Sequence, residues 1–130
     1  MAIQRWAAPC GALIIAIAGT IAAASAQDAG SADRGKQVFE QCAPCHSLDA
    51  DVTIVGPSLH GLFGRPAASL DSFDYSNALY ASGITWNAAT VAKWVTGPSA
   101  MVPGTKMQFD GIGDPGAVAD LIAYLQAATQ

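Results

Sequence analysis

The sequence predicts a small all-α domain with three main helices and one or two short ones, joined by long loops. Two observations support this prediction. Apolar residues recur at helical spacing in several segments, and no segment alternates apolar and polar residues for long enough to suggest a sheet. The chain has 130 residues, which is room for one domain. A domain of about this size is often only marginally stable, so an additional source of core would be useful.

The first helix is expected to begin at Ser31 or Asp33, because either side chain is a good N-cap. It is expected to run to about Cys42. Its apolar residues are Val38 and Phe39.

A long loop region follows, between Cys45 and Thr85, with about 40 residues rich in Gly, Pro, Ser and Asp. It holds at most one short helix, near residues 77–81. Loops of this length are uncommon in a compact domain unless they wrap a large rigid object that supplies the missing core.

Two later helices have clear boundary signals. Thr85 or Asn87 caps a middle helix that Gly97-Pro98 ends. Asp114 caps the last helix, and Pro115 occupies its first position. Both have apolar residues at helical spacing: Val91, Trp94 and Val95 in the middle helix, and Val118, Leu121, Ile122 and Leu125 in the last.

The first 26 residues have the pattern of a secretory signal peptide. A positively charged start, residues 1–5, precedes an apolar stretch over residues 7–23 and the small-residue site Ala24-Ser25-Ala26. We therefore expect residues 1–26 to be cleaved and residues 27–130 to form the exported domain. The alternative is a retained anchor, because about 20 apolar residues can span a bilayer.

The overall composition excludes several classes of protein. The chain is 52% hydrophobic and 12% charged, which excludes a disordered chain, and its net charge of −4 excludes charge-driven binding of nucleic acid. Three cysteines are too few for a disulfide-stapled scaffold.

The motif Cys42-Ala43-Pro44-Cys45-His46 is the C-x-x-C-H sequence of covalent haem attachment. Two thiols at this spacing add to the two vinyl groups of one haem, and the following histidine reaches the iron as an axial ligand. A haem would also supply the core that the long loops lack.

Three other readings of the motif compete with haem. A structural zinc site needs four Cys or His ligands. Outside the motif, residues 27–130 contain only one such residue, His60. A thioredoxin-type redox pair needs a βαβ context, which is missing. A disulfide between Cys42 and Cys45 would leave His46 and the long loops unexplained.

The sixth position on the iron has three candidate ligands: Met101, Met107 and His60. Met107 ends a loop shaped by proline and glycine, residues 103–107. A single methionine is usually core filler, and spacing alone does not decide among the three.

Residues 35–125 resemble class I cytochrome c, the mitochondrial type and its bacterial relatives. The resemblance covers nearly all of the predicted exported domain. It rests on the haem motif, on GPSLHGLFGR at 56–65, on PGTKM at 103–107 and on DLIAYL at 120–125. These segments occur in the family's order and near its spacing, so the resemblance implies the class I cytochrome c fold, wrapped around one haem c.

The resemblance also assigns roles to individual residues. Cys42 and Cys45 would bind the haem, with His46 and Met107 as the iron ligands. The carbonyl of Pro57 would orient His46. Four further positions match residues that the family places around the haem: Tyr75 and Trp86 as donors to a propionate, Arg65 as a nearby cation, and Phe109 at the haem edge.

The sequence departs from the family pattern at several positions. Leu79 replaces an asparagine near the haem, and Trp94 replaces a tyrosine that touches the methionine sulfur, so a hydroxyl donor is lost there. Gln41 replaces a lysine, and only Lys106 remains of the lysine ring around the haem edge. Docking to an acidic face by charge is therefore not expected. The expected docking patch is formed by Gln41, Ala43, Lys106 and Phe109.

The resemblance implies a soluble periplasmic monomer that carries single electrons and has no catalytic residues. Its partners would be redox proteins: a quinol–cytochrome c oxidoreductase, a terminal oxidase, or a periplasmic dehydrogenase or reductase. It would meet a membrane only through such complexes. Two alternatives stay open: a carrier tethered by residues 1–26, and a haem enzyme or gas-binding protein in which Met107 is displaceable.

Overall fold

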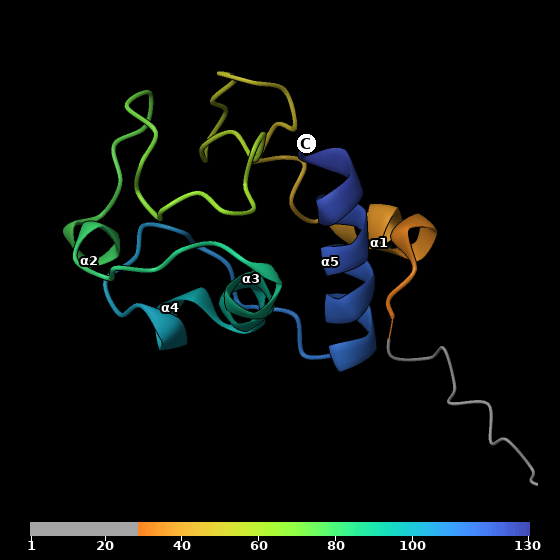
Figure 1. The fold of residues 1–130 in the computed structure, drawn as a ribbon. Coiled ribbons are helices and arrows are strands. Elements are labelled where there is room, and N and C mark those ends of the chain that lie inside the picture. The colour runs from red at the N-terminus through yellow and green to blue at the C-terminus, as the bar shows by residue number, and fades with distance from the viewer. Residues whose placement is uncertain (1–28) are drawn as a thin grey trace, which may run out of the picture.

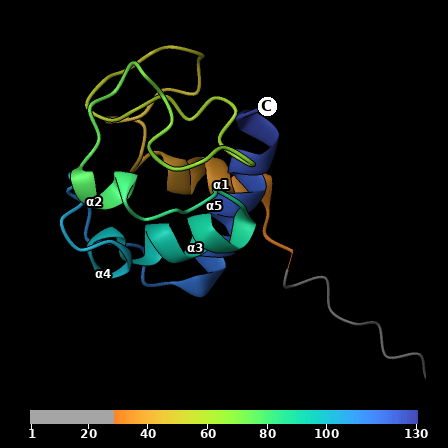
Figure 2. The same cartoon turned by 60° about the vertical axis from the view of Figure 1, so that its left-hand side comes forward.

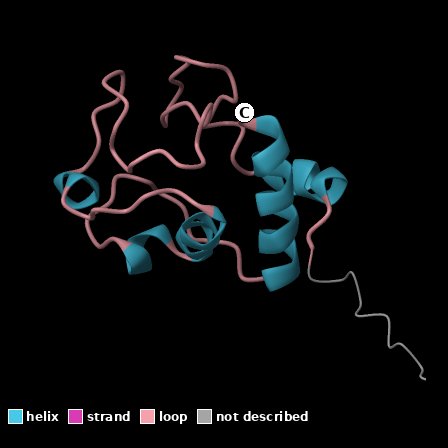
Figure 3. Cartoon of the chain, viewed as in Figure 1, coloured by secondary structure: helices cyan, strands magenta, loops and turns pink. Residues whose placement is uncertain are grey.

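The computed structural model describes residues 29–130, so the predicted signal peptide lies outside the described residues. This part of the chain is helical and contains no strand (Figures 1 and 3), which confirms the predicted all-α class. It has five helices: α1 (Ala32–Phe39), α2 (Asn77–Tyr80), α3 (Ala88–Thr96), α4 (Pro98–Met101) and α5 (Pro115–Ala128). None of these helices is both long and apolar enough to cross a membrane.

Helices α1 and α5 make the most extensive helix–helix contact, and they lie side by side in Figures 1 and 2. The crossing depends on Gly35, where a Cβ atom would lie 1.9 Å from the carbonyl oxygen of Asp120. Close beside it, Phe39 packs on Tyr124 with ring centroids 5.4 Å apart. A small residue at the crossing therefore brings the two backbones together.

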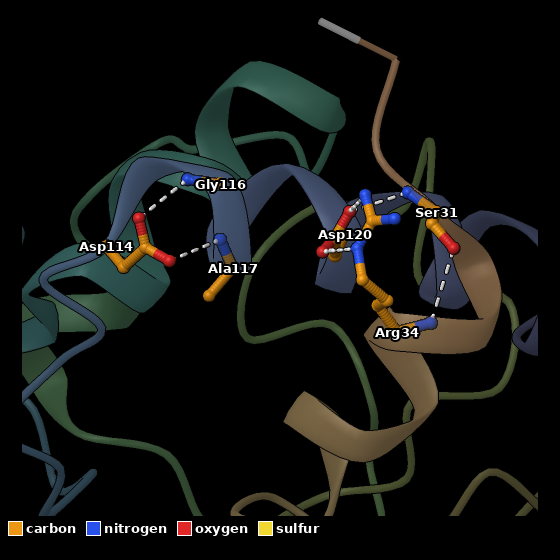
Figure 4. A network of polar contacts seen from close by, with 6 residues as sticks. All are labelled: Ser31, Arg34, Asp114, Gly116, Ala117 and Asp120. Atoms are coloured by element: carbon orange, nitrogen blue, oxygen red, sulfur yellow. Dashed lines mark hydrogen bonds and ion pairs between the residues drawn. The ribbon is translucent and has the colours of Figure 1, made fainter. Parts of the chain in front are cut away.

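An ion pair ties the start of α1 to α5 (Figure 4). The guanidinium of Arg34 donates two hydrogen bonds to the Asp120 carboxylate, at 2.7 and 2.9 Å. The backbone N–H of Ser31, the N-cap of α1, donates a third at 2.6 Å. The pKa of Asp120 is lowered, first by the Arg34 hydrogen bonds and then by Ser31.

Side-chain hydrogen bonds cap the first turns of α2, α3 and α5. Asn87 and Thr90 form a reciprocal capping box at α3, and Asp114 accepts from the N–H groups of Gly116 and Ala117 at α5 (Figure 4). Ser76 caps α2, the short helix predicted near residues 77–81.

Two predicted boundaries differ from the structure. The first helix ends at Phe39 instead of Cys42, and a series of tight turns continues to His46. Gly97 ends α3 as predicted, but Pro98 then starts the separate helix α4. Proline is well suited to a first helical position, since that position needs no N–H donor.

Candidate haem site

The loops and helices enclose a cavity of about 320 Å³. Four stretches and α3 contribute to its wall. The lining residues are Gln41, Cys42, Cys45, His46, Val55, Gly56, Pro57, Phe73, Tyr75, Ser76, Leu79, Trp94, Thr105, Lys106, Met107, Gln108 and Phe109. The C-x-x-C-H motif and the loop that ends at Met107, far apart in sequence, thus line the same cavity.

The turn after α1 places the motif on one wall. The N–H of His46 donates to the carbonyl of Cys42 at 2.9 Å, which closes a helical turn across the motif. Cys42 and Cys45 are not bonded to each other and both are half-buried. Burial raises the pKa of the Cys42 thiol to about 11.

His46 is oriented by its neighbours. Its Nδ1 lies 2.8 Å from the carbonyl oxygen of Pro57, which only accepts, so Nδ1 carries the proton and donates. Nε2 then keeps a free lone pair, as a metal ligand requires. Burial lowers the pKa of His46, and the Pro57 hydrogen bond opposes this shift.

Gly56 leaves room for the imidazole ring. A Cβ atom at this position would lie 2.5 Å from Cε1 and 2.9 Å from Nδ1 of His46. Any larger residue would therefore push the ring out of place.

Of the three candidates for the sixth ligand, Met107 is the one that lines the cavity. Its sulfur accepts a hydrogen bond from the indole N–H of Trp94 at 3.1 Å. Met101 instead lines a hollow beside α3 and α4, and His60 is outside the cavity wall. The expectation that Trp94 leaves the sulfur without a donor was incomplete, because the indole nitrogen takes the place of the hydroxyl.

The other predicted haem neighbours divide into two groups. Pro57, Tyr75 and Phe109 line the cavity, and burial raises the pKa of Tyr75. Arg65 and Trp86 are outside the lining set. Arg65 donates to the carbonyls of Ser58 and His60, at 3.1 and 2.8 Å, and so braces the loop behind the cavity.

Trp86 is buried against Trp94, with ring centroids 5.3 Å apart. It therefore supports the indole that holds Met107. Leu121 and Ile122 belong to the adjoining hydrophobic core, Leu59 and Phe63 pack against it, and none of the four lines the cavity.

Sequence reasoning missed three apolar or small residues of the wall: Val55, Phe73 and Ser76. Val55 directly precedes the GPSLHGLFGR segment, which was a usable signal. Phe73 and Ser76 lie in the long loop and have no motif of their own.

The structure adds no further ligands for the alternative zinc site. Within residues 29–130 no three His, Cys, Asp or Glu side chains converge as a metal site would need. Two thiols, an imidazole with its Nδ1 already bonded and a thioether, all lining one largely apolar cavity, instead fit a covalently bound haem.

The cytochrome c family model matches residues 32–129. The chain belongs to the cytochrome c family. Cytochrome c2 of Blastochloris viridis is 45% identical over 114 residues, which is 87% of each chain. Cytochrome c2 of Rhodomicrobium vannielii is 45% identical over 108 residues, 82% of this chain and 85% of that one.

A solved structure agrees with this assignment. Cytochrome cH from Methylobacterium extorquens superposes with a TM-score of 0.71 at 42% identity, covering 75% of this chain and 99% of that one. The predicted class I cytochrome c fold is thereby confirmed. The protein is a single-haem electron carrier and not an enzyme, with haem c attached through Cys42 and Cys45, and it exchanges electrons with redox proteins.

Proposed function

We propose that this cytochrome is a soluble periplasmic carrier of single electrons, in which His46 and Met107 would ligate the haem iron. One observation carries the proposal: an imidazole with Nδ1 held by Pro57 and the thioether of Met107 line one cavity. When bound, the haem would supply one-electron redox chemistry through its iron, which the His46 imidazole and the Met107 thioether would hold.

The protein's own groups set the conditions for that exchange. Pro57 fixes the imidazole, and Trp94 holds the sulfur of Met107. A buried, mostly apolar wall lowers the local dielectric constant, which favours the ferrous state and raises the reduction potential. Tyr75 would donate to a propionate. Arg65 and Trp86 would act from just behind the cavity wall.

The proposed location in the periplasm rests on the predicted signal peptide, residues 1–26. We propose cleavage after Ala26, release of residues 27–130 and export to the periplasm, on the charged start, apolar stretch and small-residue site of the sequence. N-terminal sequencing of the mature protein tests this step. A chain that begins at Met1 would support the tethered alternative.

The partners would be a quinol–cytochrome c oxidoreductase, a terminal oxidase, or a periplasmic dehydrogenase or reductase, met by a monomeric carrier. The charge at the cavity bears on how they dock. Lys106, the one charged residue of the lining set, forms an ion pair with Asp74 at 2.5 Å. A docking mode based on a ring of free lysines is therefore not available on the cavity wall.

The ligand assignment is tested by the absorption spectrum of the ferric protein. A Met–iron bond gives a charge-transfer band, which Met107→Ala should abolish and Met101→Ala should preserve. Retention of the band in Met107→Ala would refute the assignment. Carbon monoxide binding to the ferrous wild type near neutral pH would favour the gas-binding alternative.

A further inference from the structure

Two exposed aliphatic side chains lie in one short segment of the chain, beside a third that lines the cavity. Val52 and Ile54 are 41% and 53% exposed and lie outside the cavity wall, whereas Val55 next to them lines the cavity. Scattered exposed apolar residues are ordinary, but a cluster of them marks a surface that another molecule covers. We define residues 52–55 as the apolar segment.

Backbone hydrogen bonds hold the apolar segment against the haem-attachment motif. Thr53 forms an antiparallel bridge with His46, and the N–H of Gly56 donates to the carbonyl of Cys45 at 2.8 Å. Val55 itself lines the cavity. The exposed side chains are thus held beside the mouth of the cavity by the backbone that carries the iron ligand.

This position matters because electrons must pass between the cavity and a partner over a short distance. In Figures 1 and 2 the loops beyond the motif form the upper edge of the molecule, away from α3 and α4. A partner seated on the apolar segment would lie beside Cys45 and His46. The segment is therefore continuous with the electron-transfer site.

The charges around the apolar segment indicate which kind of partner face can dock on it. Lys106 is paired with Asp74, and the segment is preceded by Asp49 and Asp51. The whole chain has a net charge of −4. An acidic partner face would meet one cation on the cavity wall, Lys106, whose charge the exposed Asp74 carboxylate already offsets, and would be repelled at longer range.

We propose that the apolar segment is the docking surface for a redox protein whose own docking face is apolar at its centre and lacks a ring of acidic side chains. Apolar contact would hold the pair together, and electrostatic steering would contribute little. This inference rests on the proposed carrier function and names the surface and the partner chemistry that the carrier uses.

The test uses the haem-loaded protein on gold electrodes whose monolayers imitate partner faces. Methyl-terminated, carboxylate-terminated and ammonium-terminated monolayers are compared by voltammetry at low and high salt. We expect the methyl surface to give the fastest direct exchange, with little dependence on salt. Val52→Thr/Ile54→Thr, which keeps β-branched shapes at two exposed positions, should lower exchange on the methyl surface several-fold.

Tyr80→Ser is the matched control, since it removes an exposed apolar side chain outside the segment. It should leave exchange on the methyl surface unchanged. Faster, salt-sensitive exchange on the carboxylate surface would overturn the proposal. So would wild-type behaviour of the double variant, or an equal loss in Tyr80→Ser.

Two further measurements separate this proposal from others. Redox titration with a dissolved mediator tests the carrier function without docking, so a normal titration together with an unaffected double variant would refute only the docking surface. Sedimentation velocity at increasing concentration tests a second copy as the occupant. A dimer that Val52→Thr/Ile54→Thr dissociates would overturn the partner proposed here.

Discussion

The indole N–H of Trp94 donates a hydrogen bond to the sulfur of Met107 at 3.1 Å. Trp94 reaches the cavity from α3, and Trp86 packs on its ring with a T-shaped geometry. An indole nitrogen has one N–H to donate and accepts no hydrogen bond, so once it donates to the sulfur it cannot also bond a water as a hydroxyl could. The sulfur of Met107 is therefore held by a single donor on a rigid aromatic pair.

Trp94→Phe removes this donor and keeps an aromatic ring. A hydrogen bond to the sulfur withdraws electron density from it, which weakens its bond to ferric iron more than to ferrous iron. We therefore expect Trp94→Phe to lower the reduction potential and to shift the Met–iron charge-transfer band. Both are measured by spectroelectrochemical titration of the purified protein.

Phe39→Leu is the matched control, because it trims a buried aromatic side chain that does not line the cavity. It should leave the charge-transfer band in place. An unchanged potential in Trp94→Phe, or an equal fall in both variants, would show that the indole N–H does not act on the sulfur.

Much of the fold could be predicted from local chemistry. Ser31, Asn87 and Asp114 cap their helices through bonds to residues two or three positions away, so the signal is complete in a short window of sequence. The position of α4, the second short helix, was not predicted, because Gly97-Pro98 indicates an end and the same proline can begin a new helix.

The haem site also combines features that a short stretch of sequence predicts with contacts that depend on the whole fold. The C-x-x-C-H motif is local, so five consecutive residues are enough to predict the haem. The hydrogen bond from Trp94 to Met107 joins α3 to the loop that follows α4, and the sequence indicated only that a hydroxyl was lost. Val55 and Phe73 line the cavity because of long-range loop closure, which periodicity does not encode.

Gly56→Ala should destabilise the protein through the iron ligand. The added methyl group would lie 2.5 Å from Cε1 of His46, so the ring or the loop must move. Overpacking of this kind costs about 1–3 kcal/mol in the free energy of unfolding. Urea unfolding of the haem-loaded protein measures this loss, and the ferric spectrum reports any displaced ligand.

Gly113→Ala provides the comparison, since a Cβ atom there meets nothing within 4 Å. Its free energy of unfolding should stay within about 1 kcal/mol of the wild type, with any change toward stability. If both alanine variants unfold at the same urea concentration, the close approach of Gly56 to the imidazole has no energetic importance.

The reaction with an acidic-faced oxidase should depend little on salt, or should speed up as salt rises. The chain is acidic overall, and Lys106 on the cavity wall is already paired with Asp74. Added salt then screens a repulsion between the two proteins and not an attraction. Steady-state oxidation rates from low to high ionic strength measure this dependence. A fast reaction that weakens steeply with salt would contradict the prediction.

Asp120 makes the stability of the α1–α5 crossing depend on pH in the acid range. Its folded-state pKa is lowered by the hydrogen bonds from Arg34 and Ser31, below the unfolded value of about 3.9. A lowered folded pKa contributes stability that is present above the unfolded value and is lost as pH falls through the folded one. The wild type should therefore lose stability below about pH 4.

Asp120→Asn removes the titrating group, so the free energy of unfolding should be lower at pH 7 and should fall less steeply between about pH 5 and pH 2. Urea unfolding across this range measures both effects. Asp110→Asn removes an exposed carboxylate away from the ion pair and should keep the wild-type slope. A wild-type slope in Asp120→Asn would place the acid sensitivity elsewhere, because the contact with Arg34 would then not be coupled to folding.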